Sequence, residues 1–263
     1  MTEAKDKDMS FLEHLEELRW HIIRSFIGII VIAVGVFLAK DFIFNEIILK
    51  PTSNDFITYR WICKKFEPLC FGPGEVTVFT KELGEQFIIH LKVSFWFGLI
   101  VAFPYVFYEV WKFISPGLYS QEKQATRGIV FICTFLFLTG VAFGYFVISP
   151  FAISFLSNYQ VSEMVSDSFT LSSIVNYMTM FTIPTGLVFQ LPVAVYFLSK
   201  LGLVTPAWMK QYRRHAFVII LVLAAIITPP DMITQLLIGI PLYFLYEISI
   251  WISARVEKKR NND

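Results

Sequence analysis

The sequence predicts an all-α integral membrane protein with six transmembrane helices in a single polytopic membrane domain, residues 1–263. Hydrophobic residues make up 56% of the chain and charged residues 16%, and the mean hydropathy is +0.60. Soluble domains carry about 25% charged residues, so this composition excludes that class. The apolar stretches that supply the six helices are residues 22–44, 87–114, 128–157, 169–199, 216–228 and 232–254.

The N-terminal segment, residues 1–21, is predicted to form an amphipathic helix that holds three glutamates beside the membrane. These are Glu13, Glu16 and Glu17. Cytoplasmic segments next to a membrane are normally basic, so acids there require a cationic partner. Ser10 and Glu13 fit a capping box, which gives Glu13 a structural role. The partner of the other two acids has to be found elsewhere.

Local ion pairs are the structural alternative for these two acids. Glu16 can pair with Arg19 three residues on, and Glu17 can pair with His21 four residues on. Such exposed helical pairs contribute only ~0.3–0.5 kcal/mol, which is little reason to gather acids here. The segment mixes acids with lysines and does not resemble a cleavable signal peptide, so we expect the first span to be retained.

The distribution of Lys and Arg predicts that both termini lie in the cytoplasm. The two tails, including residues 254–263, and the loops after the second and fourth spans all carry Lys or Arg. The second and third loops on the opposite side carry none, and orientation follows these residues in short loops. The first loop on that side, residues 40–85, has six of them but is long enough for the rule to weaken.

This long outer loop contains Cys63 and Cys70, followed by a turn-rich Phe-Gly-Pro-Gly stretch at residues 71–74. The turn residues favour a separate small flap. The two thiols could close a short ring in an oxidising compartment, and spacing alone leaves a disulfide and two reduced thiols equally open.

The fourth apolar stretch, residues 169–199, has no charged side chain and is longer than the ~20 residues that cross a bilayer. It must therefore tilt or bend, and Pro184 and Pro192 are the expected cause of a bend. Gln190 lies between them, and a polar amide at this depth needs a partner. The freed carbonyls near a proline are one such partner, and another helix is the alternative.

The fifth and sixth helices are predicted to be short. Only 15 residues separate His215 from Asp231, which corresponds to roughly 22 Å of helix against a ~30 Å hydrocarbon core. The sixth apolar stretch is also short before it reaches Glu247. A hairpin of this length should thin the bilayer or be shielded by longer helices.

The sequence does not favour an enzyme. It has no GxSxG elbow and no GxGD-type aspartate motif, and none of its four histidines falls at the centre of a span. We expect no catalytic residue, metal or cofactor, and no nucleic-acid partner. The alternative to a receptor is a small-solute or ion transporter with a polar site near the midplane at Gln190 and Glu247.

Five motifs that occur in order along the chain resemble the TatC family, the multispanning receptor subunit of the twin-arginine protein translocase. They are HLEELR at residues 14–19, EVWKFISPGLYSQEK at 109–123, FGYFVISPFAISFL at 143–156, FQLPVAVYFL at 189–198 and ITPPDMITQLLIGIPLYFLYEI at 227–248. The resemblance implies a multi-pass protein of the bacterial cytoplasmic (inner) membrane that exports folded proteins and uses the protonmotive force.

The resemblance also implies a recognition site for the paired arginines of a signal peptide. Its residues would be Glu17 and Arg19 in the N-terminal helix, with Phe113 and Glu122 in the first cytoplasmic loop. Two glutamates suit this task because guanidinium makes planar, two-pronged bonds to a carboxylate, whereas lysine offers a point charge. The cationic partner that the acidic helix lacks would then be the signal peptide.

The same resemblance implies an oligomeric complex in the lipid bilayer with small single-span subunits of the TatA/TatB type. Gln190 stands at the family's polar position in the fourth span, where many members carry glutamate, and it would contact the partner helix. Asp231 matches the outer TPPD turn, where it either caps the turn or serves transport.

Overall fold

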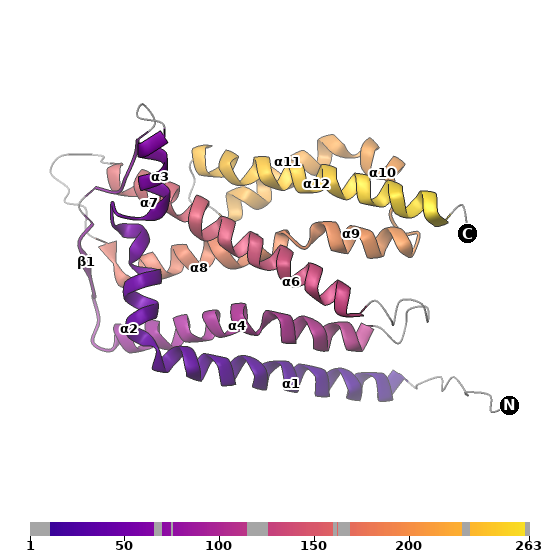
Figure 1. The fold of residues 1–263 in the computed structure, drawn as a ribbon, viewed down its shortest axis with the longest axis horizontal. Helices are drawn as coiled ribbons and strands as arrows, with labels where there is room; N and C mark the ends of the chain where they lie inside the picture. The colour runs from indigo at the N-terminus through magenta and orange to yellow at the C-terminus, as the bar shows by residue number, and fades with distance from the viewer. Residues whose placement is uncertain are drawn as a thin grey trace. The chain divides into compact units, whose positions relative to one another are not determined.

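A computed structural model describes most of the chain, and the described part is almost entirely helical (Figure 1). The described residues are 11–65, 70–74, 76–114, 126–159, 162, 169–227 and 232–260. They form two compact units. The first unit comprises Met1–Leu38 and Ser94–Thr134, and the second comprises Ala39–Val93 and Phe135–Asp263. The single membrane domain expected from composition stays a prediction.

Five helices or helical runs in the described part are long and apolar enough to cross a membrane. They are His14–Leu38, Glu85–Ile114, Gly128–Asn158, Leu171–Lys200 and Thr234–Arg260. This confirms the prediction of an all-α membrane protein, because each run also exceeds the ~20 residues that span a bilayer.

The first unit is built on α1 (Phe11–Leu38) and the part of α4 (Glu85–Ile114) that starts at Ser94. The two helices run side by side (Figure 1). Small residues bring them together: a methyl group on Gly98 would lie 2.8 Å from the Ala33 Cβ, and one on Gly28 would lie 2.7 Å from the Tyr105 ring. Inside a membrane the hydrophobic effect does not drive helices together, because lipid chains are as apolar as the side chains. Small residues at helix contacts therefore allow the close packing that holds the helices together.

The second unit has its core where five segments meet. These are η5 (Gly144–Ile148), α7 (Ser149–Asn158), α8 (Leu171–Val188), α11 (Arg213–Ile227) and α12 (Met232–Arg260). The buried residues shared by this core are Ile148, Ala152, Phe181, Phe189, Ile220, Ala224, Ile238, Leu242 and Leu245. The remaining α-helices of this unit outside the long loop are the start of α4 (up to Val93), α6 (Thr126–Phe143, from Phe135 on), α9 (Leu191–Lys200) and α10 (Pro206–Gln211).

The fourth apolar stretch bends where the sequence predicts it. Helix α8 ends at Val188 and α9 begins at Leu191, so the break falls on Phe189 and Gln190, just before Pro192. Proline has no N–H to donate and disfavours a helical residue before it, which explains a break at this place. Pro184, by contrast, lies inside α8.

The fifth helix is short, as predicted, because α11 has 15 residues. The prediction of a short sixth helix is wrong, because α12 has 29 residues and continues through Glu247 to Arg260. Its apolar part before Glu247 is short, but the charge does not end the helix. The Glu247 carboxylate accepts a hydrogen bond from the Arg213 guanidinium at 2.7 Å, and this pair lets a charged residue lie inside the helix.

The outer loop folds as a cap on the second unit. Its elements are α2 (Lys40–Phe42), η1 (Ile43–Ile48), η2 (Lys50–Thr52), α3 (Ile57–Lys65) and β1 (Val78–Phe79). Strand β1 pairs in parallel with β2 (Phe169–Thr170), with Val78 opposite Phe169. This pairing ties the end of the loop to the start of α8.

The prediction that this loop forms a separate flap is wrong. The Tyr59 hydroxyl donates to the carbonyls of Pro51 and Pro150, at 3.1 and 2.9 Å, and Thr58 Oγ1 donates to the Phe146 carbonyl at 2.6 Å. Burial raises the pKa of the Tyr59 phenol, which is consistent with a hydroxyl enclosed between two carbonyls. The cap is therefore bonded directly to η5 and α7.

The structure closes Cys63 and Cys70 into a disulfide, with Cα atoms 4.3 Å apart. The sequence left this pairing open against two reduced thiols. The bond joins the end of α3 to the Gly72 region, where the Ser154 hydroxyl donates to the Gly72 carbonyl at 2.9 Å. The disulfide thus holds the cap together beside its contact with α7.

Candidate functional site

The acidic segment forms the first turns of α1 in the first unit. Glu16 and Arg19 are exposed, whereas Glu17 is half-buried. The Oε2 atom of Glu17 is buried and has no hydrogen-bond partner among the described residues. A buried acceptor without a partner costs about 1–3 kcal/mol, more when it is charged. Glu17 therefore has an unfilled capacity to bind a donor.

The structural alternative, a pair of Glu17 with His21, does not form, because His21 binds another residue. His21 Nδ1 lies 2.5 Å from Glu109 Oε2 in α4, and both side chains are only 6% exposed. The Glu109 carboxylate reaches the His21 imidazole in the buried contact between α1 and α4, whereas Glu17 lies one helical turn before His21 and is only half-buried. His21 is thus occupied, and Glu17 stays available.

The alternative pair of Glu16 with Arg19 is likewise not among the ion pairs of the described residues. The Arg19 guanidinium carbon instead lies 5.6 Å from the centre of the Trp20 ring. This is a cation–π contact on the exposed side of α1. The charges of Glu16 and Arg19 are therefore open to solvent or to a ligand.

Phe113 in α4 lies next to the acidic segment. Its ring stacks on the His14 ring with centroids 4.4 Å apart, and it meets His21 edge-on at 6.2 Å. His14 precedes Glu17 by one helical turn and His21 follows it by one turn. Glu17 and Phe113, which the family resemblance assigns to one site, thus lie at the same end of the first unit.

An apolar cavity of about 300 Å³ begins at this end and follows α1 and α4. The residues that line it are Leu18, His21, Ile22, Ser25, Phe26, Ile29, Val106, Val110 and Phe113. Ile22, Phe26 and Val110 are also exposed on the helix surfaces. The first unit therefore places an unpartnered carboxylate oxygen and an open apolar groove at the same end, an arrangement that suits a ligand with a cationic end followed by an apolar stretch.

Two of the sequence-predicted residues, Glu122 and Asp231, lie outside the described residues. So does the capping box of Ser10 and Glu13. Gln190 belongs to the second unit, where it is half-buried at the break between α8 and α9. Its backbone carbonyl accepts from the amides of Val193 and Ala194, both at 3.0 Å, which starts α9.

Glu247, the second residue of the transporter alternative, is paired with Arg213. Its ion pair with Arg213 involves the first residue of α11. The carboxylate therefore lies level with the end of that helix rather than its middle. Among the described residues, no group of three His, Cys, Asp or Glu side chains could hold a metal ion.

The buried pair of His21 and Glu109 was not found by sequence reasoning. Its signal was an acid inside an apolar helix near the membrane, which implies a nearby partner. The partner is 88 residues away in the chain, so no helical spacing rule points to it. The pair fixes the contact of α1 with α4 on which the groove is built.

Comparison with known proteins gives the same picture for nearly the whole chain. The family model described as "Sec-independent protein translocase protein (TatC)" matches residues 13–241. The TatC protein of Blattabacterium sp. subsp. Periplaneta americana is 38% identical over 260 residues, covering 96% of this chain and 98% of its own. The TatCy protein of Bacillus subtilis is 32% identical over 260 residues, covering 98% and 94%.

A crystal structure of the twin-arginine translocase receptor TatC superposes with a TM-score of 0.71 at 32% identity, covering 92% of this chain and 98% of that one. A second crystal structure of this receptor, in DDM, gives a TM-score of 0.73 at 32% identity. The family model covers well over half of the chain, and relatives above 30% identity cover nearly all of it. This chain therefore belongs to the TatC family of Sec-independent protein translocase proteins.

Proposed function

We propose that the protein is the receptor subunit of a twin-arginine translocase and that the acidic end of its first unit binds the paired arginines of a signal peptide. The observation that carries this is the buried Oε2 of Glu17, which lacks a hydrogen-bond partner among the described residues and precedes Leu18, a residue that lines the apolar groove. A guanidinium would supply the missing donor. Relief of the unpaired acceptor then adds to the charge-assisted bond.

Each proposed residue has a distinct role. Glu17 accepts the two-pronged bond of one arginine, and Glu122 from the first cytoplasmic loop accepts the other. Phe113 presents its ring next to the acidic segment, where a guanidinium can stack on its face. The exposed Arg19 binds acceptor groups of the peptide and limits the net negative charge, so that the site accepts a specific pair of arginines rather than any cation.

The groove accounts for the remainder of the signal. A solvated Arg–Glu pair contributes only about 0–1 kcal/mol, too little for a receptor. Burying one Leu or Phe side chain of the signal contributes about 1.5–3 kcal/mol, so two or three such residues along Ile22, Phe26 and Val110 raise the affinity substantially. The twin arginines then give specificity and register, and the apolar stretch gives affinity.

In this proposal the protein is a multi-pass component of the bacterial cytoplasmic membrane with both termini inside, as the Lys and Arg distribution predicts. Single-span subunits of the TatA/TatB type bind around Gln190, which lies half-buried at the break between α8 and α9. Asp231 belongs to the turn that joins the two last helices. Assembly with these subunits opens a path for folded proteins, driven by the protonmotive force.

Binding of a labelled Arg-Arg signal peptide to the purified protein tests the site. Glu17→Gln keeps the size of the side chain and removes its charge, and loss of a charge-assisted bond of about 1.5–3 kcal/mol weakens binding about 10- to 150-fold. Glu16→Gln is the matched control on the exposed side of the same helix, and it should bind like the parent. Equal affinity of the Glu17→Gln and Glu16→Gln proteins would refute the assignment of Glu17.

Photo-crosslinking tests the groove and the partner contact separately. A photoreactive residue in the apolar part of the signal should label Val110, whereas one placed before the arginines should not. A photoreactive residue at position 190 should capture a single-span subunit in an active complex. Labelling of Val110 without capture at position 190 would support the receptor role and exclude the proposed partner site.

A further inference from the structure

A second, larger cavity lies in the second unit, where the cap meets η5. Its volume is about 760 Å³. The residues that line it are Glu46, Ile47, Lys50, Asp55, Phe56, Ile57, Arg60, Trp61, Lys64, Tyr145 and Phe146. None of them belongs to the site proposed above, and all of them come from the cap or from the helix that the cap contacts.

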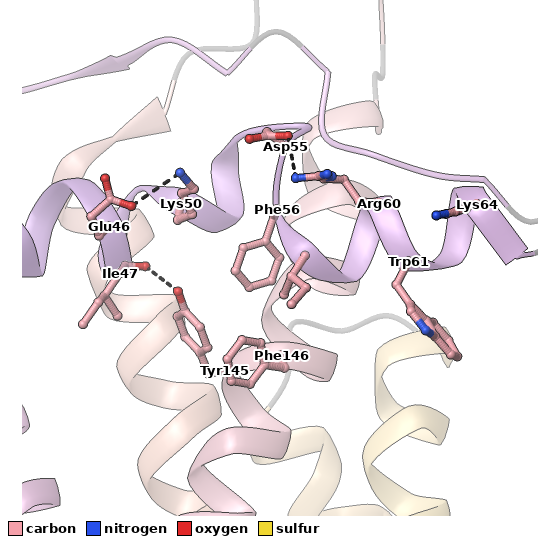
Figure 2. Close-up of a pocket in the computed structure, with 11 residues that line it drawn as sticks. Glu46, Ile47, Lys50, Asp55, Phe56, Arg60, Trp61, Lys64, Tyr145 and Phe146 are labelled. Carbon is pink, nitrogen blue, oxygen red and sulfur yellow. Dashed lines mark hydrogen bonds and ion pairs between the residues drawn. The ribbon is translucent and has the colours of Figure 1, made fainter.

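The cavity has two chemically different sides (Figure 2). The charged groups lie along its upper edge in the view: the pair of Glu46 with Lys50, the pair of Asp55 with Arg60, and Lys64. Aromatic rings lie below them. A cavity divided in this way suits an amphiphile, with a polar head on one side and an apolar tail on the other.

The charged edge favours an anion. Three cations face two carboxylates, and both pairs are long, at 3.5 Å, and exposed, so they contribute only about 0–1 kcal/mol and can exchange partners. Lys64 is exposed and has no ion pair within the described residues. Lys65 adds a further positive charge next to the cavity, with its Nζ 5.3 Å from the centre of the Trp61 ring.

The apolar side is rigid at its base and open at its rim. Phe56 is 3% exposed, and its ring contacts those of Tyr145 and Phe146 at centroid distances of 5.5 and 6.0 Å. The Tyr145 hydroxyl donates to the Ile47 carbonyl at 2.9 Å, which fixes the ring (Figure 2). At the rim Ile57 and Trp61 are 63% and 57% exposed, one turn apart on α3.

The cavity lies where a bilayer surface is expected. Phe146 belongs to the membrane-length run Gly128–Asn158, and Thr58 of α3 is bonded to the Phe146 carbonyl. Helix α3 therefore rests on the outer part of a span. Its exposed Trp61 is the residue type that gathers at the headgroup level, and its lysines are the type that reaches toward phosphates.

We propose that this cavity binds an anionic phospholipid of the surrounding bilayer. The phosphate lies against Lys64, with Lys50 and Arg60 beside it, and an acyl chain packs along Trp61 and Phe146. The bound lipid closes the open rim of the cavity and anchors the disulfide-linked cap at the membrane surface. Free phosphate is not the proposed ligand, because it leaves the apolar side unfilled.

Quenching of Trp61 by brominated lipids tests this proposal in nanodiscs that contain the intact protein. The Trp61 signal is the difference between the parent and Trp61→Phe. Phosphatidylglycerol with brominated chains should quench it at a lower mole fraction than brominated phosphatidylcholine does. A juxtamembrane cation adds about 1 kcal/mol to binding of an anionic surface, so Lys64→Gln should reduce the preference about fivefold.

Lys81→Gln is the matched control, since Lys81 is an exposed lysine of the same outer loop that does not line the cavity. It should leave the preference unchanged. Equal quenching by the two lipids would mean an unspecific interfacial anchor, and absence of quenching would mean that no chain enters the cavity. Reversal of quenching by excess inorganic phosphate would mean a small-anion site. Each of these three results would overturn the proposal.

Discussion

Removal of the Glu109 carboxylate should destabilise the first unit strongly. Glu109 and His21 meet at 2.5 Å and each side chain is 6% exposed, so solvent cannot replace either partner. Glu109→Ala leaves the His21 imidazole buried without its acceptor. Breaking a buried pair by removing one partner costs about 3–5 kcal/mol, whereas an exposed pair costs at most about 1 kcal/mol.

The isosteric substitution separates charge from hydrogen bonding. Glu109→Gln keeps a hydrogen-bonding group against His21, so its cost should be nearer to 1 kcal/mol. Since 1 kcal/mol shifts Tm by about 2–4 °C in a chain of this size class, Glu109→Ala should lower Tm by about 6–20 °C. The double substitution Glu109→Ala with His21→Ala should cost less than the sum of the single ones, because it leaves no unpaired buried group.

The chain contains its own reporter for this measurement. Cys133 belongs to the first unit and is 0% exposed, whereas Cys63 and Cys70 are held in a disulfide. A thiol-reactive fluorogenic maleimide therefore reports unfolding of the first unit through Cys133. Glu16→Gln on the exposed side of α1 is the control. Identical melting of Glu109→Ala and Glu16→Gln would show that the buried pair does not stabilise the unit.

Two other perturbations follow from the packing. Gly98→Val places side-chain atoms against Ala33, because a Cβ alone at position 98 would lie 2.8 Å from the Ala33 Cβ. This substitution should lower the free energy of unfolding by about 1–3 kcal/mol in the same thiol assay. Gly35→Val is the control, since its side chain meets open space and should lack this overpacking penalty. The raised pKa of Tyr59 means that the folded cap holds the phenol proton more tightly than the unfolded chain, whose value is 10.0. The contribution of Tyr59 to cap stability should therefore be complete below pH 10 and be lost as the pH rises beyond it. Tyr59→Phe should weaken this pH dependence in thermal melts between neutral and alkaline pH. The same dependence of Tm on pH in both proteins would contradict it.

The bend and the short fifth helix could be predicted because each depends on local sequence. Pro192 lacks an N–H, which favours the break observed at Gln190. The fifth apolar stretch lies between His215 and Asp231 in the sequence, and this limits the length that α11 can have. In both cases the cause and the effect lie within a few residues of each other.

The contacts that build the site and the cap could not be predicted in this way. His21 contacts Glu109, which is 88 residues away in the chain, and Thr58 contacts Phe146 at the same separation. Such contacts depend on which helices pack against each other. Hydrophobic periodicity predicts which face of a helix is apolar, but not which other helix that face contacts. The continuation of α12 through Glu247 has the same origin, since its cationic partner lies on another helix.

Discrimination between Arg-Arg and Lys-Lys signal peptides by the purified protein tests the receptor proposal most directly. The parent should bind the Arg-Arg peptide at least about 10-fold more tightly, because only guanidinium makes the two-pronged bond to a carboxylate. In Glu17→Gln combined with Glu122→Gln, the two peptides should bind with nearly equal and weaker affinity. A parent protein that binds both peptides equally, or a double variant that keeps the full preference, would contradict the proposed site.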